Sequence, residues 1–136
     1  MEDFIKQFQK LQERVEELEK KKFTKFKVTK AISYPGASFP RSGSFTSSGG
    51  TILIFVSASA FISSGNVPSI DVKVDNIVKG TIKVYTNEIN SHKALVMDVI
   101  VLTNIASGNH TLDLVLATGA SDSNDFSQAT VLELPL

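Results

Sequence analysis

The chain has 136 residues, of which 42% are hydrophobic and 21% are charged, as in a compact globular domain with a short appendage. Its 14 basic and 14 acidic residues give no formal net charge, which argues against a dedicated nucleic-acid-binding protein. The absence of cysteine excludes disulfides, thiol nucleophiles and Cys-ligated metal centres.

The sequence carries no signal for membrane insertion or secretion. None of its apolar runs approaches the roughly 20 residues that span a bilayer. The first residues, MEDF, are acidic where a secretion signal is basic. We therefore expect synthesis in the cytosol without a signal peptide, and no membrane insertion.

Residues 1–22 have the pattern of a coiled-coil helix. Apolar side chains recur at alternating gaps of three and four, and Gln, Glu, Lys and Leu, which favour helices, dominate the segment. The stripe is too narrow for a helix that packs on a globular core, so we predict a coiled-coil neck formed between copies of the chain. A single amphipathic helix packed on its own domain is the alternative. The expected oligomerisation residues are Phe4, Phe8, Leu11, Val15 and Leu18.

From residue 23 the period changes to that of β-strands. Runs rich in Val, Ile, Thr and Phe are separated by Gly, Asn, Asp and Ser. Seven or eight short strands with polar turns predict an all-β head domain over residues 23–136, built as an antiparallel β-sandwich or barrel. The expected strands are 23–32, 43–47, 50–62, 69–75, 77–86, 93–103, 109–117 and 126–134.

Two of these segments, 51–56 and 94–102, are apolar on both faces. An antiparallel strand of this kind has its outer face covered as well as its inner one. The chain has no spare segment for that purpose, so we predict that a second copy covers it. The segments 70–75 and 81–85 alternate between apolar and polar residues, and each is expected to have a solvent face.

Few residues are candidates for catalysis or metal binding. The sequence contains neither a Gly-x-Ser-x-Gly nucleophile motif nor a phosphate-binding glycine motif, so we expect no catalytic residue. His92 and His110 lack the close spacing of metal ligands, and we interpret both as surface or turn residues. Residues 121–125, SDSND, are rich in oxygen ligands, but a turn capped by Asp and Asn side chains is favoured over a calcium site. We predict no metal and no cofactor.

A short helix followed by a β head, together with seven segments, resembles a known group. The segments are 43–60 (GSFTSSGGTILIFVSASA), 72–76 (VKVDN), 79–80 (KG), 92–95 (HKAL), 107–112 (SGNHTL), 124–126 (NDF) and 131–135 (VLELP). They resemble the β-sandwich modules at the tips of bacteriophage tail, baseplate and receptor-binding proteins, whose layout is similar to trimeric C1q/TNF-like heads. The resemblance extends over nearly the whole chain. It implies a jelly-roll-like fold, a homotrimer and a place in the virion, and it transfers no binding residue.

These observations together predict a non-enzymatic phage structural protein of the tail tip, a homotrimer that attaches to host-surface glycans and contacts other virion proteins. A bacterial C1q/TNF-like surface adhesion module is the alternative, and a small β-sandwich hydrolase is disfavoured because a nucleophile motif is missing. Polar side chains beside an aromatic ring suit sugar recognition. The candidate ligand-binding residues are Asn90, His92, Asp122, Asn124, Asp125 and Phe126.

Overall fold

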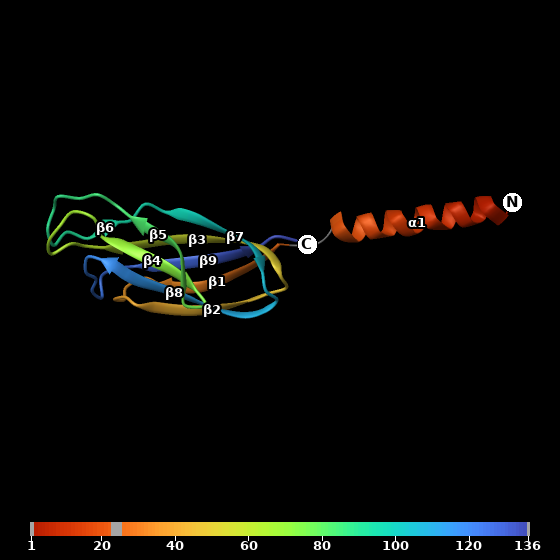
Figure 1. Cartoon of the computed structure of the whole chain (residues 1–136). Coiled ribbons are helices and arrows are strands. Elements are labelled where there is room, and N and C mark those ends of the chain that lie inside the picture. Colours follow the sequence, from red (N-terminus) through yellow and green to blue (C-terminus); the bar gives the residue numbers. More distant parts are fainter. Residues whose placement is uncertain (1, 23–25, 136) are drawn as a thin grey trace.

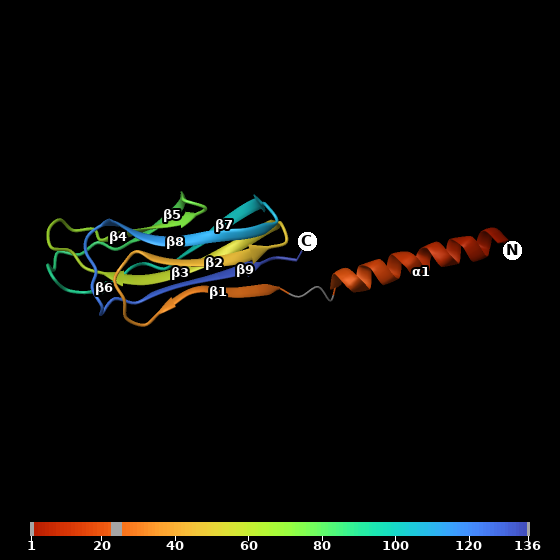
Figure 2. The same cartoon turned by 90° about the horizontal axis from the view of Figure 1, so that it is seen from below.

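The computed structural model describes residues 2–22 and 26–135, which form an N-terminal helix and a β-sandwich of two sheets (Figures 1 and 2). The helix, α1, spans Glu2–Lys22, in agreement with the heptad pattern. The sandwich leaves the apolar stripe of α1 exposed, from Phe4 to Leu18, so the alternative of a helix packed on its own domain is not what the structure shows. The coiled coil between copies stays a prediction. The described part of the chain holds no helix that is both long and apolar enough to cross a bilayer.

Nine strands make up the sandwich of the described chain. Their bounds are β1 (Lys27–Tyr34), β2 (Arg41–Ser47), β3 (Gly50–Ala60), β4 (Ser69–Val74), β5 (Ile77–Lys83), β6 (Lys93–Ala94), β7 (Asp98–Ile105), β8 (Gly108–Thr118) and β9 (Ser127–Glu133). Most of them correspond to the predicted strands within a few residues. The predicted residues 23–25 lie outside the described residues. The predicted strands 77–86 and 93–103 differ from the observed ones.

The predicted strand 93–103 is divided into β6 and β7, and the predicted strand 77–86 ends at Lys83. Both differences have one cause. The amide of Leu95 donates to the carbonyl of Ala58 on β3, and the next amide, of Val96, donates to the carbonyl of Lys83 at the end of β5. The chain therefore connects the two sheets at this point instead of continuing along one of them. A run of apolar residues in the sequence does not show where a chain passes between sheets.

All strand pairings are antiparallel. One sheet, called sheet A, has the order β1-β9-β3, and β6 and β7 pair with the other edge of β3 at separate places. The second, sheet B, has the order β2-β8-β4-β5. The two sheets lie face to face (Figure 2). The predicted all-β, jelly-roll-like sandwich preceded by a short helix is confirmed.

The core lies between the sheets and follows from the alternation of side chains along each strand. Every second residue of β3 from Ile52 to Ala58 is buried, and the buried residues Leu112 and Leu114 of β8 belong to the same cluster. On the outside of sheet B, Asp71 accepts a hydrogen bond from the hydroxyl of Thr81, 2.7 Å away. The solvent face predicted for these strands is therefore present.

One end of the sandwich is joined to α1, and the other is formed by loops. Lys27 at the start of β1 pairs with Glu133 at the end of β9, so both of these strand ends lie on the side from which α1 extends (Figure 1). The opposite end, which we call the tip, is made by the loops after β1, β3, β5 and β8. These loops comprise residues 35–40, 61–68, 84–92 and 119–126.

Candidate binding site at the tip

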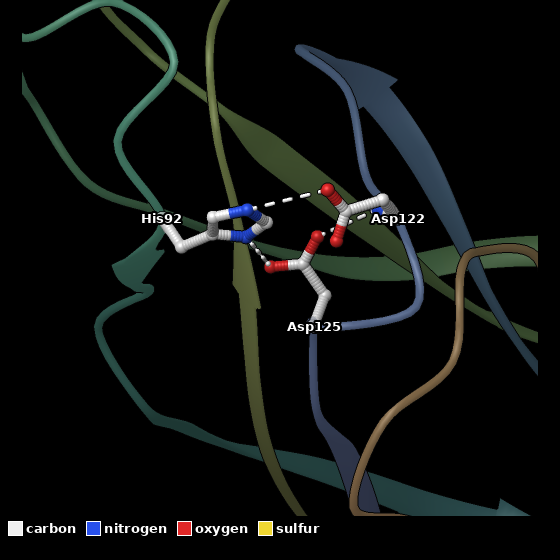
Figure 3. Close-up of side chains that lie close together, drawn as sticks. All are labelled: His92, Asp122 and Asp125. Atoms are coloured by element: carbon white, nitrogen blue, oxygen red, sulfur yellow. Dashed lines mark hydrogen bonds and ion pairs between the residues drawn. The ribbon is translucent and has the colours of Figure 1, made fainter.

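Three of the predicted ligand-binding residues meet at the tip (Figure 3). His92 lies immediately before β6, while Asp122 and Asp125 belong to the loop between β8 and β9. The distance from Nδ1 of His92 to Oδ1 of Asp125 is 2.7 Å, and the distance from Nε2 of His92 to Oδ2 of Asp122 is 3.4 Å. One side-chain ligand atom from each residue lies within 4.8 Å of the others. We call these three residues the His92 cluster.

Asp125 is the anchor of the cluster, because its side chain is fully buried and both of its oxygens accept hydrogen bonds from the protein. Besides facing His92, Oδ1 accepts from the hydroxyl of Ser59, 2.8 Å away, and Oδ2 accepts from the amide of Asp122, 2.9 Å away. The carbonyl of Asp125 accepts from the amide of Ala37 at 2.8 Å. A buried carboxylate with this many donors is held in one orientation.

The loop that carries both aspartates is a tight turn, as the sequence predicted. Oδ1 of Asp122 accepts from the amide of Asn124 at 2.8 Å, and the amide of Asp125 donates to the carbonyl of Asp122 at 3.1 Å. The loop also packs closely against Gly36, where a Cβ atom would lie 2.6 Å from the carbonyl oxygen of Ser123. A larger residue at position 36 would displace the loop and, with it, the two carboxylates.

The His92 ring is fixed by its neighbours on two sides. One nitrogen faces each aspartate, and the ring of Phe61 contacts the imidazole with 4.8 Å between ring centroids and a 57° tilt. The hydrogen bond with Asp125, followed by the negative charges of both aspartates, raises the pKa of His92 above its usual value. Because a carboxylate accepts and does not donate, Nδ1 carries the proton of this hydrogen bond.

Of the other three predicted residues, Asn124 contacts the cluster directly, through the amide that donates to Oδ1 of Asp122. Asn90 is exposed in a left-handed conformation (φ 60°), and its amide donates to the carbonyl of Ile62 at 2.8 Å. Asn124 is also exposed. Phe126 follows Asp125 directly, leaves 37% of its surface exposed, and donates its amide to the hydroxyl of Ser59 at 3.0 Å.

Ser59 and Phe61 are parts of the site that sequence reasoning missed. Both belong to the stretch 50–62, which reads as a continuous buried strand, so nothing in that pattern distinguishes them from core residues. Their roles depend on contacts with residues 92, 125 and 126, which lie far away in the sequence.

The arrangement is suited to holding a ligand by hydrogen bonds. Nitrogen and carboxylate oxygens in this combination are also ligands for divalent cations. Here, however, a proton joins His92 to Asp125, and the Asp125 oxygens are already used by protein donors. Asp122 is the more accessible of the two carboxylates and can accept from an incoming hydroxyl group. Neither nitrogen of His92 faces a hydroxyl that it could activate as a nucleophile, within the described part of the chain.

The prediction for the second histidine, His110, was wrong. His110 is not a surface or turn residue, because it lies in β8 and is buried. Its Nδ1 lies 2.6 Å from Oδ2 of Asp75, its Nε2 lies 2.7 Å from the carbonyl oxygen of Ala106, and its ring stacks on Phe45. The hydrogen bond with Asp75 and the one with Ala106 raise the pKa of His110. The residue lines a cavity of about 250 Å³ at the end of the sandwich away from the tip.

Comparison with known proteins finds likeness in structure. No protein-family model and no curated protein sequence matches the chain. Latent PorU from Porphyromonas gingivalis is similar in structure, with a TM-score of 0.51 and 15% identity over 79% of this chain and 12% of that protein. The CBM36-1 domain of a multidomain xylanase from the hindgut metagenome of Trinervitermes trinervoides gives a TM-score of 0.48 and 15% identity, covering 81% of this chain and 98% of the domain.

A third similar structure is the C-terminal domain of EclA, a sugar-binding protein. It gives a TM-score of 0.44 and 15% identity, covering 79% of this chain and 77% of that one. The match to PorU indicates a shared fold over 79% of this chain. At such identities the likeness shows the fold alone, because one fold carries many unrelated functions. A function for this chain has to be argued from its own site.

Proposed function

We propose that the chain is a non-enzymatic attachment protein whose head binds carbohydrate at the tip. The observation that carries this proposal is the His92 cluster, a set of fixed polar groups whose loop runs directly into the partly exposed Phe126. The cluster lies at the end of the sandwich remote from α1, where a surface can approach it (Figure 1).

The chemistry of sugars matches such a site. Each sugar hydroxyl can accept and donate a hydrogen bond, and the apolar face of a pyranose ring packs on an aromatic side chain. Asp122 offers an acceptor, and Phe126 offers a ring. Because Asp125 already fixes the loop, little conformational entropy is lost when the ligand binds.

Self-association is the second part of the proposal. The exposed stripe of α1, with Phe8 and Leu11 at its centre, supports a coiled coil between copies of the chain, and the resemblance to phage tail-tip modules implies that the copies number three. Three tips on one assembly bind a repetitive surface far more tightly than one tip, because the second and third contacts form at a high effective concentration.

The biological setting of this protein is proposed from its sequence resemblance. We place the trimer in a bacteriophage virion, at or near the tail tip, where it contacts other virion proteins through its neck and host glycans through its head. A bacterial surface adhesion module has the same physical properties, and the two settings differ in where the protein is found. Labelling purified virions with an antibody against the head would distinguish them.

Binding to a glycan array tests the central proposal. The full chain is compared with Asp122→Ala and Phe126→Ala, and with Lys83→Ala as a control on the exposed surface of sheet B. We expect the full chain and the control to bind the same glycans, and each tip variant to bind them at least about tenfold more weakly, as for the loss of one ligand hydrogen bond or ring contact. Equal binding by all four proteins, or no binding by the full chain, would contradict the proposal.

A further inference from the structure

The outer face of sheet A carries apolar side chains in the half nearest α1. Residues that pair directly on neighbouring strands point to the same face of a sheet. Val28 pairs with Leu132, Leu132 with Leu53, and Leu53 with Val101, which gives one continuous apolar row across β1, β9, β3 and β7. These four residues alternate with core residues along their strands, so the row faces outwards.

The next row towards the tip begins the change to a polar surface. Phe55 pairs with Val99 and with Thr130, which in turn pairs with Lys30 at the margin on β1. One row further on, Ser57 and Ser33 both pair with Gln128. The apolar residues of the first two rows form what we call the sheet A patch. It consists of Val28, Leu53, Phe55, Val99, Val101 and Leu132.

The two ends of the first row are open to solvent in the single chain. The exposed fraction is 61% for Val28 and 57% for Val101, and the residues between them are half-buried by their neighbours. A contiguous apolar surface spread over four strands is unusual on a protein that stays monomeric, and such surfaces mark sites of association. The sheet A patch contains no charged residue, so an ionic ligand does not suit it.

The patch lies near the end of the head from which α1 extends. Residues 23–26 separate the end of α1 from β1, and four extended residues span at most about 14 Å. Phe26, directly before β1, is exposed as well. Copies that associate through α1 therefore hold the patches of their heads within a short distance of one another, and the half of sheet A that is apolar is the half nearest to α1.

We propose that the sheet A patch packs on a second copy of this chain. The inference rests on the self-association proposed above and names the surface of the head that takes part in it. An apolar face without charges can meet an identical face without placing like charges opposite one another, as symmetric interfaces require. Three heptads form a marginal coiled coil by themselves, so contact between the heads also supplies the stability that the neck needs.

The first test is the dissociation of the full-length assembly on dilution, measured by light scattering and sedimentation. Val101→Glu places a charge in the patch, and Val78→Glu is the matched control on β5 of sheet B, where the wild-type side chain is 48% exposed. We expect V101E to raise the concentration of half-dissociation at least about tenfold, and V78E to leave it unchanged. Equal behaviour of both variants and the wild type would overturn the inference.

The absence of cysteine permits a second test with a milder substitution. In the full-length assembly, the thiol of V101C is expected to react with a maleimide at least about tenfold more slowly than the thiol of V78C, and the two rates should become equal in urea. Equal rates under native conditions would overturn the inference. Because Cys is close to Val in size, this test holds even where V101E fails to fold.

The outcomes separate this inference from the proposed function. A stable trimer with a fully reactive V101C thiol would overturn the patch contact and leave the coiled-coil trimer standing. A monomeric full chain would overturn both the trimer and the patch contact. Glycan binding by the tip is measured on its own, so its loss in D122A does not depend on either result.

Discussion

Replacing Asp125 with alanine tests the account of the tip most directly. The side chain is fully buried and accepts three hydrogen bonds, from the Ser59 hydroxyl, the His92 ring and the amide of Asp122. Asp125→Ala removes all three at once and leaves the Ser59 hydroxyl without its buried acceptor. The loop between β8 and β9 loses the contact that ties it to β3.

The magnitude follows from the number and kind of these bonds. A hydrogen bond to a charged group contributes about 1.5–3 kcal/mol, but the three share one carboxylate and do not add fully. Less than full addition of three such bonds gives an expected decrease of about 3–5 kcal/mol in the free energy of unfolding. For a domain of this size that corresponds to a decrease in Tm of at least about 12 °C.

Urea unfolding followed by circular dichroism measures this difference, with Asp122→Ala as the matched control. Asp122 belongs to the same loop, but its side chain is partly exposed, so D122A is expected to cost no more than about 1 kcal/mol. Equal, small effects of D125A and D122A would refute the claim that Asp125 anchors the site. A large effect of D122A alone would reverse the roles that we assign to the two carboxylates.

Three further predictions concern other parts of the chain. The hydrogen bond with Asp75 raises the pKa of His110, so its stabilisation is complete below the usual value of 6.5 and lost as the pH rises through the raised pKa. The urea midpoint should therefore fall in that range, and H110N should make this fall smaller while leaving the part that the raised pKa of His92 contributes. Hydrogen bonds from Ser47 and Ser48 lower the pKa of Glu133, so stability should be lost as the pH falls through that lowered value, below 4.5, and E133Q should lose less. Leu11→Asp should dissociate the assembly in light scattering while the β-sheet circular dichroism of the head stays unchanged, and a persistent trimer would contradict the role of α1.

The sequence was sufficient for the elements whose signal is local. The heptad spacing of Phe4 to Leu18 predicted α1, and the alternation within segments such as 50–62 and 109–117 predicted strands of a sandwich, because both patterns record which side of an element meets a core. The break at residues 95–97 was missed. It depends on hydrogen bonds to two different sheets, and hydropathy along one segment carries no record of them.

The candidate site was predicted in part. Composition singled out His92, Asp122 and Asp125, but it could not show that Asp125 is buried or that Ser59 completes its hydrogen bonds, since these contacts join segments far apart in the sequence. His110 is different, because a local signal was present. His110 lies two and four residues before the inward-facing Leu112 and Leu114, and alternate residues of a strand point to the same side of the sheet, so its ring is expected to face the core.

The pairing of the first residue of β1 with the last residue of β9 has a practical consequence. A fluorescent protein or biotin acceptor peptide joined behind β9 would emerge on the opposite side of the head from His92. Under the proposed function, such a fusion would stain glycan-bearing cells without shielding the side chains at the tip, which would turn the head into a probe for searching cell envelopes.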